Sequence, residues 1–408
     1  MTPLRIFAAF VLLAGCAPPS GISSVPLMEP PVLFEDGNIV TATPVDRAVP
    51  YATQREPGGS GIERAYVDVP STILRAGFAE VAIGPRTDGP AAEPIVAIGD
   101  VAEVGPLTAS RQPAADPQLF ANAGPEIDRV FAARLDRQLA ERSGEDIVIY
   151  VHGTRADFAN PVLAAAELQH VSGYRNLFVA YAWPANTGLL TYFQDTEDST
   201  NSAFQFRRFL RFLADETAAR RIHIIAHSAG TRMVSEAIGV FALEHRNSTR
   251  AQIAQELRLG QVMLIGSDAD PIRVGGYLID GIDRVVDDLT IYASGRDCAL
   301  RISNIVFGER NRLGQTTRGP LPPYVQRFIG SFDNVHLIDV TDAERSNFAN
   351  GHGYLRGSPW VSSDILAAVT LGLGPAERGL VRVQGTVVRW SFPEDYAAQL
   401  RARAAPAL

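Results

Sequence analysis

The stretch RIHIIAHSAGTR (residues 221–232) decides the fold. An apolar run ends at Ser228, and the small residues Ala226 and Gly230 lie two positions to either side of it. A strand that turns sharply into a helix explains this pattern, because the two elements can approach each other only where the flanking side chains are small. The serine then stands at the carboxyl end of the strand, above a helix N-terminus that favours negative charge. The alternative is an ordinary helix N-cap.

Strands and helices alternate along the rest of the chain. Apolar runs predict strands at residues 64–70, 79–85, 146–153, 176–184, 221–226, 261–267, 288–294 and 334–340. Helical spacing of apolar residues predicts helices at residues 126–142, 160–171, 201–219, 231–243 and 362–373. Near-continuous apolar strands between helices are typical of buried parallel strands. The sequence therefore predicts an α/β fold with a mostly parallel central sheet and helices on both faces.

The first residues read as a secretory signal. Arg5 precedes a short apolar run that is too short to span a bilayer, and the run ends in Leu13-Ala14-Gly15-Cys16. This ending resembles the lipobox of bacterial lipoproteins. The resemblance implies a signal peptide over residues 1–15, a lipid on Cys16, and a chain anchored to a membrane of the bacterial cell envelope. The alternative is a buried apolar N-terminal helix.

Residues 16–60 are rich in proline and carry few periodic apolar side chains. Such composition is typical of an extended tether, which would leave residues 61–408 as the folded domain. The stretch PVLFE (residues 31–35) leaves a second possibility open, an N-terminal arm that packs on the domain surface.

Charge and composition exclude several classes of function. The formal net charge of −8 argues against a general nucleic-acid binder, which needs a basic face. Cys16 and Cys298 are the two cysteines of the chain, too few for a disulfide framework or a thiolate zinc site. The sequence has neither an H-E-x-x-H motif nor a glycine-rich phosphate loop, so no metal and no cofactor is expected.

The pentapeptide AHSAG resembles the G-x-S-x-G turn of α/β-hydrolases and departs from it at Ala226. Other stretches resemble a bacterial branch of serine esterase/lipase-like hydrolases of largely unassigned function, and the resemblance covers roughly residues 61–373. These stretches are IVIYVHGTR (147–155), FVAYAWPA (178–185), YFQDTEDSTNSAFQFRRFL (192–210), LTIYASGRDCAL (289–300) and GHGYLRGSPWVSSDIL (351–366). The resemblance implies the α/β-hydrolase fold and a Ser-His-Asp triad.

The resemblance also implies roles for particular residues. Ser228 would be the nucleophile and His352, in the glycine-flanked loop NGHGY, the base. Asp297 would be the acid, which gives the chain order Ser, Asp, His of this superfamily. Asp270 is the alternative acid and Asp268 a third, and each of the three could instead be a turn residue.

An oxyanion hole needs two backbone N–H donors, and the resemblance implies those of Thr154 and Ala229. The imidazole of His152 is then expected to order this loop. The remaining histidines are not expected to act as the base: His170, His223, His227, His245 and His336.

The sequence thus predicts a lipid-anchored serine hydrolase that cleaves small-molecule or lipid carboxylic esters through an acyl-enzyme. A thioesterase, amidase or acyltransferase on the same triad is one alternative. A non-catalytic envelope lipoprotein that uses the fold for binding is another.

Overall fold

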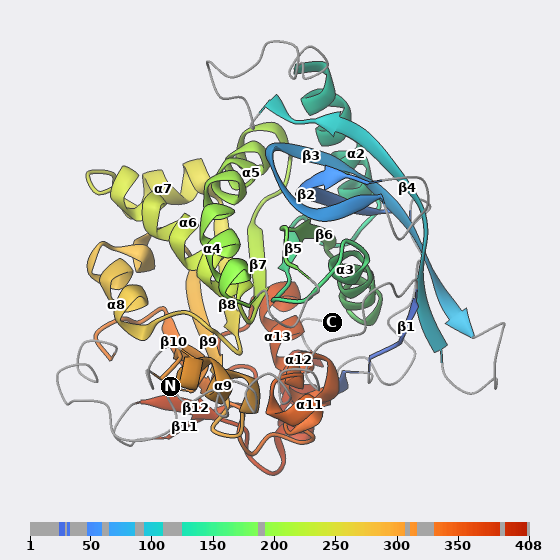
Figure 1. Ribbon diagram of the computed structural model, residues 1–408. Coiled ribbons are helices and arrows are strands. Elements are labelled where there is room, and N and C mark those ends of the chain that lie inside the picture. Colours follow the sequence, from blue (N-terminus) through green and yellow to red (C-terminus); the bar gives the residue numbers. More distant parts are fainter. Residues whose placement is uncertain are drawn as a thin grey trace.

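The computed structural model describes residues 24–28, 31–32, 47–58, 65–85, 94–108, 125–186, 192–306, 311–315, 330–383 and 388–405. The expected signal peptide and Cys16 lie outside these residues. The described strands form one sheet in the order β1-β4-β3-β2-β6-β5-β7-β8-β9-β10-β12-β11 (Figure 1). The strands are β1 (Ser24–Pro26), β2 (Val49–Pro57), β3 (Tyr66–Pro85), β4 (Pro94–Pro106), β5 (Ile147–Val151), β6 (Leu177–Ala182), β7 (Ile222–His227), β8 (Leu259–Ile265), β9 (Asp288–Ala293), β10 (Val335–Asp339), β11 (Val381–Val383) and β12 (Arg389–Ser391).

The middle of the sheet is parallel. Every neighbouring pair from β2 through β6, β5, β7, β8, β9 and β10 to β12 runs in the same direction. The strands β1, β4 and β3 pair antiparallel on one side, and β11 pairs antiparallel with β12 on the other. This mostly parallel sheet confirms the predicted α/β fold class.

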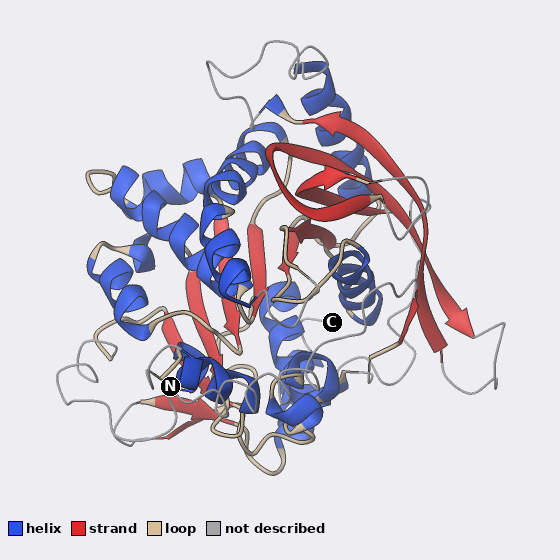
Figure 2. Ribbon diagram, viewed as in Figure 1, coloured by secondary structure: helices blue, strands red, loops and turns tan. Residues whose placement is uncertain are grey.

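Helices cover both faces of the sheet (Figure 2). They are α2 (Pro125–Ala140), α3 (Ala159–Val171), α4 (Tyr192–Asn201), α5 (Ala203–Glu216), α6 (Gly230–Glu244), α7 (Arg250–Leu257), α8 (Pro271–Ile279), α9 (Cys298–Val306), α11 (Phe348–Gly351), α12 (Tyr354–Gly357), α13 (Pro359–Leu371) and α14 (Tyr396–Ala404). None of the helices among the described residues combines the length and apolar character needed to cross a membrane.

Each face of the sheet has its own hydrophobic core. In β5, Ile147, Ile149 and Val151 pack in the core that α2, α5 and α6 cover, while Val148 and Tyr150 pack in the core that α3, α13 and α14 cover. Successive side chains of a strand point to opposite faces, so a strand buried on both sides must be apolar throughout. This requirement explains the continuous apolar runs in the sequence.

The folded body begins earlier than the boundary expected at residue 60. Strand β2 lies inside the sheet, antiparallel to β3 and parallel to β6, and its residues from Val49 to Gln54 are buried. Prolines at both ends of the strand (Pro50 and Pro57) made this segment resemble a linker. Proline is tolerated at the ends of a strand and at irregularities, and the pairing of β2 with β3 shifts register near its end.

Two other elements differ from their expected limits. The two strands expected at residues 64–70 and 79–85 are parts of the single strand β3. Gly77 lets this strand lie close to β4, because a Cβ at that position would lie 2.3 Å from the carbonyl oxygen of Ala102 in β4. The helix expected at residues 201–219 ends at Glu216 as α5, and α4 precedes it.

Candidate active site

Ser228 occupies a strained turn between β7 and α6. Its φ angle is +53°, in the left-handed region that residues other than glycine seldom adopt. The surrounding backbone holds this conformation: the Ser228 N–H donates to the carbonyl of Ile265 (2.9 Å), and the Ser228 carbonyl accepts from the Thr231 N–H (3.1 Å). Backbone contacts alone therefore hold this turn, and the Ser228 hydroxyl is not needed to maintain it.

Glycines on two segments make room around this serine. A Cβ on Gly230 would lie 2.3 Å from the carbonyl oxygen of His152, so α6 starts directly against the loop that follows β5. A Cβ on Gly153 would lie 2.8 Å from the Cβ of Ser228. Gly230, the small residue expected two positions after the serine, is thus needed for α6 to approach the loop after β5. Gly153 lies on the loop side of the same contact.

The imidazole of His152 orders the loop after β5. Its Nδ1 donates to the carbonyl of Gly153 (2.7 Å), and the indole Nε1 of Trp183 donates to the carbonyl of His152 (2.8 Å). The two rings stack nearly parallel, with centroids 5.1 Å apart. Burial lowers the pKa of His152 to about 3, so the ring is neutral at ordinary pH.

Two buried charged residues hold the next part of this loop, where Arg155 has a φ of +58°. The guanidinium of Arg55, on β2, donates from Nη2 to the carbonyl of Ala156 (2.6 Å) and forms an ion pair with Asp68. The carboxylate of Asp195, on α4, accepts a hydrogen bond from the backbone N–H of Arg155. The backbone around Thr154, whose N–H is an expected oxyanion donor, is therefore anchored from two sides.

His352 and Asp297 lie in contact at the carboxyl ends of β9 and β10. The His352 Nδ1 lies 2.7 Å from Oδ2 of Asp297, and both side chains are buried. The other carboxylate oxygen, Oδ1, accepts from the N–H of Leu300 (2.9 Å) in the first turn of α9. Burial by itself lowers the pKa of His352, but the charge and hydrogen bond of Asp297 outweigh it and raise the pKa above the ordinary value.

Gly266 gives the imidazole its space. It has a φ of +52°, and a Cβ there would lie 3.1 Å from Cε1 of His352. The Gly266 N–H donates to the hydroxyl of Tyr354 (2.6 Å), which fixes the residue two positions after the histidine. The end of β8 therefore packs directly against the ring of His352.

The other two candidate acids have different partners. Asp270 caps α8, since its Oδ1 accepts from the N–H of Ile272 (2.8 Å). Asp268 is buried, pairs with Arg232 (2.7 Å) and accepts from the hydroxyl of Ser303. Of the three carboxylates, the structure brings that of Asp297 to His352.

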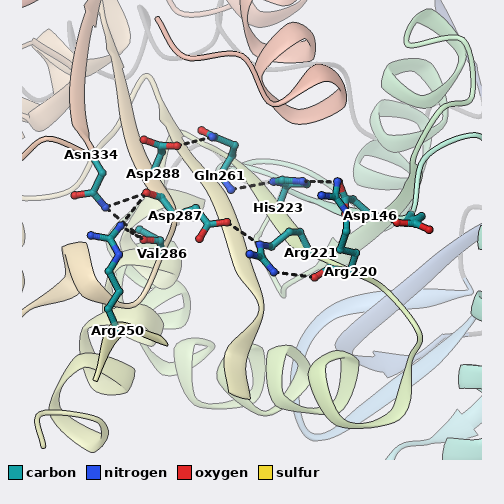
Figure 3. Close-up of polar contacts among 11 residues, drawn as sticks. Asp146, Arg220, Arg221, His223, Arg250, Gln261, Val286, Asp287, Asp288 and Asn334 are labelled. Atoms are coloured by element: carbon teal, nitrogen blue, oxygen red, sulfur yellow. Dashed lines mark hydrogen bonds and ion pairs between the residues drawn. The ribbon is translucent and has the colours of Figure 1, made fainter. Parts of the chain in front are cut away.

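The remaining histidines have their own partners. His223 lies at the amino end of β7, opposite to Ser228, where its Nε2 is 3.4 Å from Asp146 and its Nδ1 accepts from the N–H of Gln261 (2.9 Å; Figure 3). His227 Nε2 lies 3.2 Å from the carbonyl oxygen of His352. The others contact Tyr174 (His170), the Phe241 carbonyl (His245) and Asp288 (His336).

Ser228 and His352 line one cavity of about 380 Å³. Gly153 and Thr154 border it as well, and Ala229, the other expected oxyanion donor, is buried at the start of α6. The rest of its wall combines apolar side chains with a few polar ones from α3, α9 and α12. Among the described residues, no three His, Cys, Asp or Glu side chains are grouped so that they could hold a metal ion.

Four residues around this cavity were not singled out from the sequence: Arg55, Asp195, Gly266 and Tyr150. Asp195 and Tyr150 lie in stretches that carry the family resemblance, and Gly266 lies in a predicted strand, but none of the three was given a role. Arg55 lies in the proline-rich stretch and has no local signal. Its importance follows only from the place of β2 in the sheet.

A parallel sheet covered by helices on both faces, with a serine in a strained turn after a central strand, defines the α/β-hydrolase class. Residues 128–369 match the family model described as an alpha/beta hydrolase of unknown function (DUF900), and the chain belongs to this family. The resemblance to α/β-hydrolases inferred from the sequence is therefore confirmed.

A solved structure of an esterase from Pyrococcus furiosus is similar to this chain at 15% sequence identity and a TM-score of 0.28. The match covers 50% of this chain and 76% of the esterase chain. Similarity at this level carries no argument about activity. No curated protein matches the chain.

Proposed function

We propose that this protein is a serine hydrolase that cleaves carboxylic esters through an acyl-enzyme, with Ser228, His352 and Asp297 as its triad. One observation carries the proposal. Ser228, in a strained left-handed turn, and His352 line the same cavity, and His352 forms a buried pair with Asp297. Strained backbone at a cavity wall is a feature of functional sites, and the chain order of the three residues is that of α/β-hydrolases.

In the proposed reaction His352 acts as the base. Because its Nδ1 carries the proton shared with Asp297, its Nε2 is the nitrogen with a free lone pair. Nε2 takes the hydroxyl proton of Ser228 as Oγ attacks the carbonyl carbon of the ester. The imidazolium that forms is stabilised by the carboxylate of Asp297, and its proton then passes to the leaving alkoxide.

The negative charge on the carbonyl oxygen is accepted by the backbone N–H groups of Thr154 and Ala229 in this proposal. Such donors stabilise the transition state more than the ground state, and losing one typically costs about 10²- to 10³-fold in turnover. Arg55 and Asp195 hold the loop of Thr154 in place before substrate arrives. Water activated by His352 then attacks the acyl carbon, and Ser228 leaves with its proton restored.

The test is hydrolysis of aryl esters with acyl chains from acetyl to dodecanoyl, with aryl thioesters and anilides of the same acyl groups beside them. We expect turnover of the esters and a preferred chain length that reports the depth of the cavity. Turnover confined to the thioesters or anilides would move the proposal to those substrates. No turnover of any of the three series would contradict it.

We expect kcat/KM for ester hydrolysis to fall as the pH falls through the pKa of His352. Only the neutral imidazole can accept the serine proton, and the Asp297 carboxylate favours the charged form and so raises this pKa. The acid limb of the pH–rate profile should therefore lie above the ordinary histidine value of about 6.5. The measurement is kcat/KM of the best aryl ester across the pH range, and an acid limb below that value would contradict the role of the pair.

We also propose that the mature protein is held at a bacterial membrane by lipid on Cys16, as the lipobox-like residues 13–16 suggest. Several acyl chains on one cysteine would hold a protein far more firmly than a single chain. Cys16→Ser should release the protein into the soluble fraction or leave its precursor uncleaved. Fractionation and gel migration identical to those of the wild type would contradict the anchor.

A further inference from the structure

The cavity continues beyond Ser228 along a wall formed by β5, α3, β1 and α12. Val25, Leu163, Ala164 and Leu355 give this wall its apolar surface, and polar side chains from the same elements lie among them. It suits the hydrocarbon part of an ester, because apolar surface gains free energy when it leaves water. Polar groups in such a wall fix the orientation and identity of the ligand.

The hydroxyl of Tyr150 is one such polar group. Tyr150 lies on β5, two residues before His152, and only 7% of its surface is exposed, yet it lines the cavity. Its hydroxyl makes no hydrogen bond with any residue in the described part of the chain. Because Tyr150 lines the cavity, a water molecule or a ligand atom there can satisfy its hydroxyl.

An ion pair between Glu167 and Arg356 lies near this hydroxyl. Glu167 accepts from Nε (2.7 Å) and Nη2 (2.8 Å) of Arg356, and from the backbone N–H of Met28. Arg356 Nη2 also donates to the carbonyl of Pro26 (2.9 Å). The two charges balance each other, so this end of the cavity does not select for an ionic group.

Tyr150 acts as a donor here. Burial raises the pKa of its hydroxyl to about 12, so the proton is present at any ordinary pH. The matching ligand group is a neutral acceptor: a carbonyl, ether or hydroxyl oxygen on an otherwise apolar chain.

We propose that the Tyr150 hydroxyl donates a hydrogen bond to an oxygen atom in the acyl or alcohol chain of the substrate, and so favours oxygen-bearing esters over plain alkyl esters. The inference rests on the proposed function, since Ser228 would cleave the ester whose chain reaches Tyr150. It assigns to this site a substrate class that has both apolar length and an internal oxygen.

The experiment compares matched esters that differ by one oxygen. One series is aryl esters of oxo-acids, with the oxo group at each position along the chain, paired with alkyl acids of equal length. The second series places an ether oxygen in the alcohol instead. In one of the two series, we expect kcat/KM of the best oxygen-bearing ester to exceed that of its alkyl partner by about three- to tenfold, the typical worth of one neutral hydrogen bond. In Tyr150→Phe this ratio should fall towards one.

Tyr174→Phe is the matched control. Tyr174 is bonded to His170 and lies outside this cavity, so its variant should keep the wild-type ratio. A wild-type ratio near one in both series would overturn the proposal and indicate that water alone satisfies Tyr150. The same conclusion follows if Tyr150→Phe keeps the wild-type preference.

A binding measurement separates this inference from the proposed function. Calorimetry with Ser228→Ala, alone and combined with Tyr150→Phe, compares affinities for the same ester pairs without turnover. If the oxygen-bearing ester binds more tightly than its alkyl partner and Tyr150→Phe removes this difference, the subsite is supported even if the wild type hydrolyses no ester. Equal affinities for both members of each pair would overturn the subsite and leave ester hydrolysis by Ser228 unaffected.

Discussion

Replacing Ser228 by alanine is expected to abolish ester hydrolysis, with kcat reduced by about 10⁴- to 10⁶-fold, as is typical when a triad nucleophile is removed. The same change should abolish covalent labelling by an active-site phosphonate, because Oγ is the atom that the proposal makes nucleophilic. The measurements are kcat/KM for the best aryl ester and the mass of the protein after labelling.

The fold should tolerate this change. The strained conformation of Ser228 depends on its backbone contacts to Ile265 and Thr231, which alanine keeps. Serine and alanine both carry a Cβ, so the left-handed φ is about equally unfavourable for them. Thermal unfolding should therefore shift little. Ser303→Ala is the matched control, because Ser303 lines the same cavity and its loss should leave Ser228 labelled. Full labelling of Ser228→Ala would rule out Ser228 as the nucleophile.

Replacing Asp297 by asparagine is expected to reduce kcat by about 10³- to 10⁴-fold. The Leu300 N–H requires an acceptor, so the amide oxygen should stay there and the amide NH₂ should face Nδ1 of His352. Nδ1 would then have to accept a hydrogen bond, and the proton would move to Nε2, where it prevents the ring from taking the serine proton. The acid limb of the pH–rate profile should also move to lower pH, because the charge that raises the pKa of His352 is gone.

Asp270→Asn is the matched comparison for the other candidate acid. Asp270 caps α8, and asparagine is about as good an N-cap as aspartate, so stability and activity should both be largely retained. The opposite result, with activity lost in Asp270→Asn and kept in Asp297→Asn, would make the assignment of Asp297 wrong. Ser228 and His352 would remain candidates in that case.

Local patterns in the sequence were sufficient for the class of fold. Apolar runs and helical spacing locate most of the central strands and helices, because a strand buried on both faces must be apolar at every position. The extent of the sheet was harder to predict from the sequence. The strand β2 carries prolines at its second and last residues, and its place beside β6 depends on residues more than a hundred positions away. By its composition alone, the segment that contains β2 therefore resembles a tether.

The candidate site likewise contains residues that local sequence could identify and residues that it could not. Ser228 lies in a turn whose small neighbours are adjacent in sequence, and His352 lies in a glycine-flanked loop, so both could be proposed from local sequence. Asp297 was named as the acid from the resemblance, but local sequence did not separate it from Asp268 and Asp270, because all three follow strands and look like turn residues. Only the contact between His352 and Asp297, 55 residues apart, distinguishes them.

The sequence by itself thus determined the α/β class, the strand–serine–helix turn and a short set of candidate residues, since each is written in neighbouring positions. The tertiary structure decided which carboxylate meets the imidazole and that Arg55 and Asp195 anchor the loop of Thr154. It also decided that the Tyr150 hydroxyl, at the cavity wall, has no hydrogen-bond partner among the described residues. The physical reason is that hydrogen bonds and ion pairs depend on distances of a few ångströms between segments far apart in the chain. Such distances exist only after the sheet has brought the ends of its strands together.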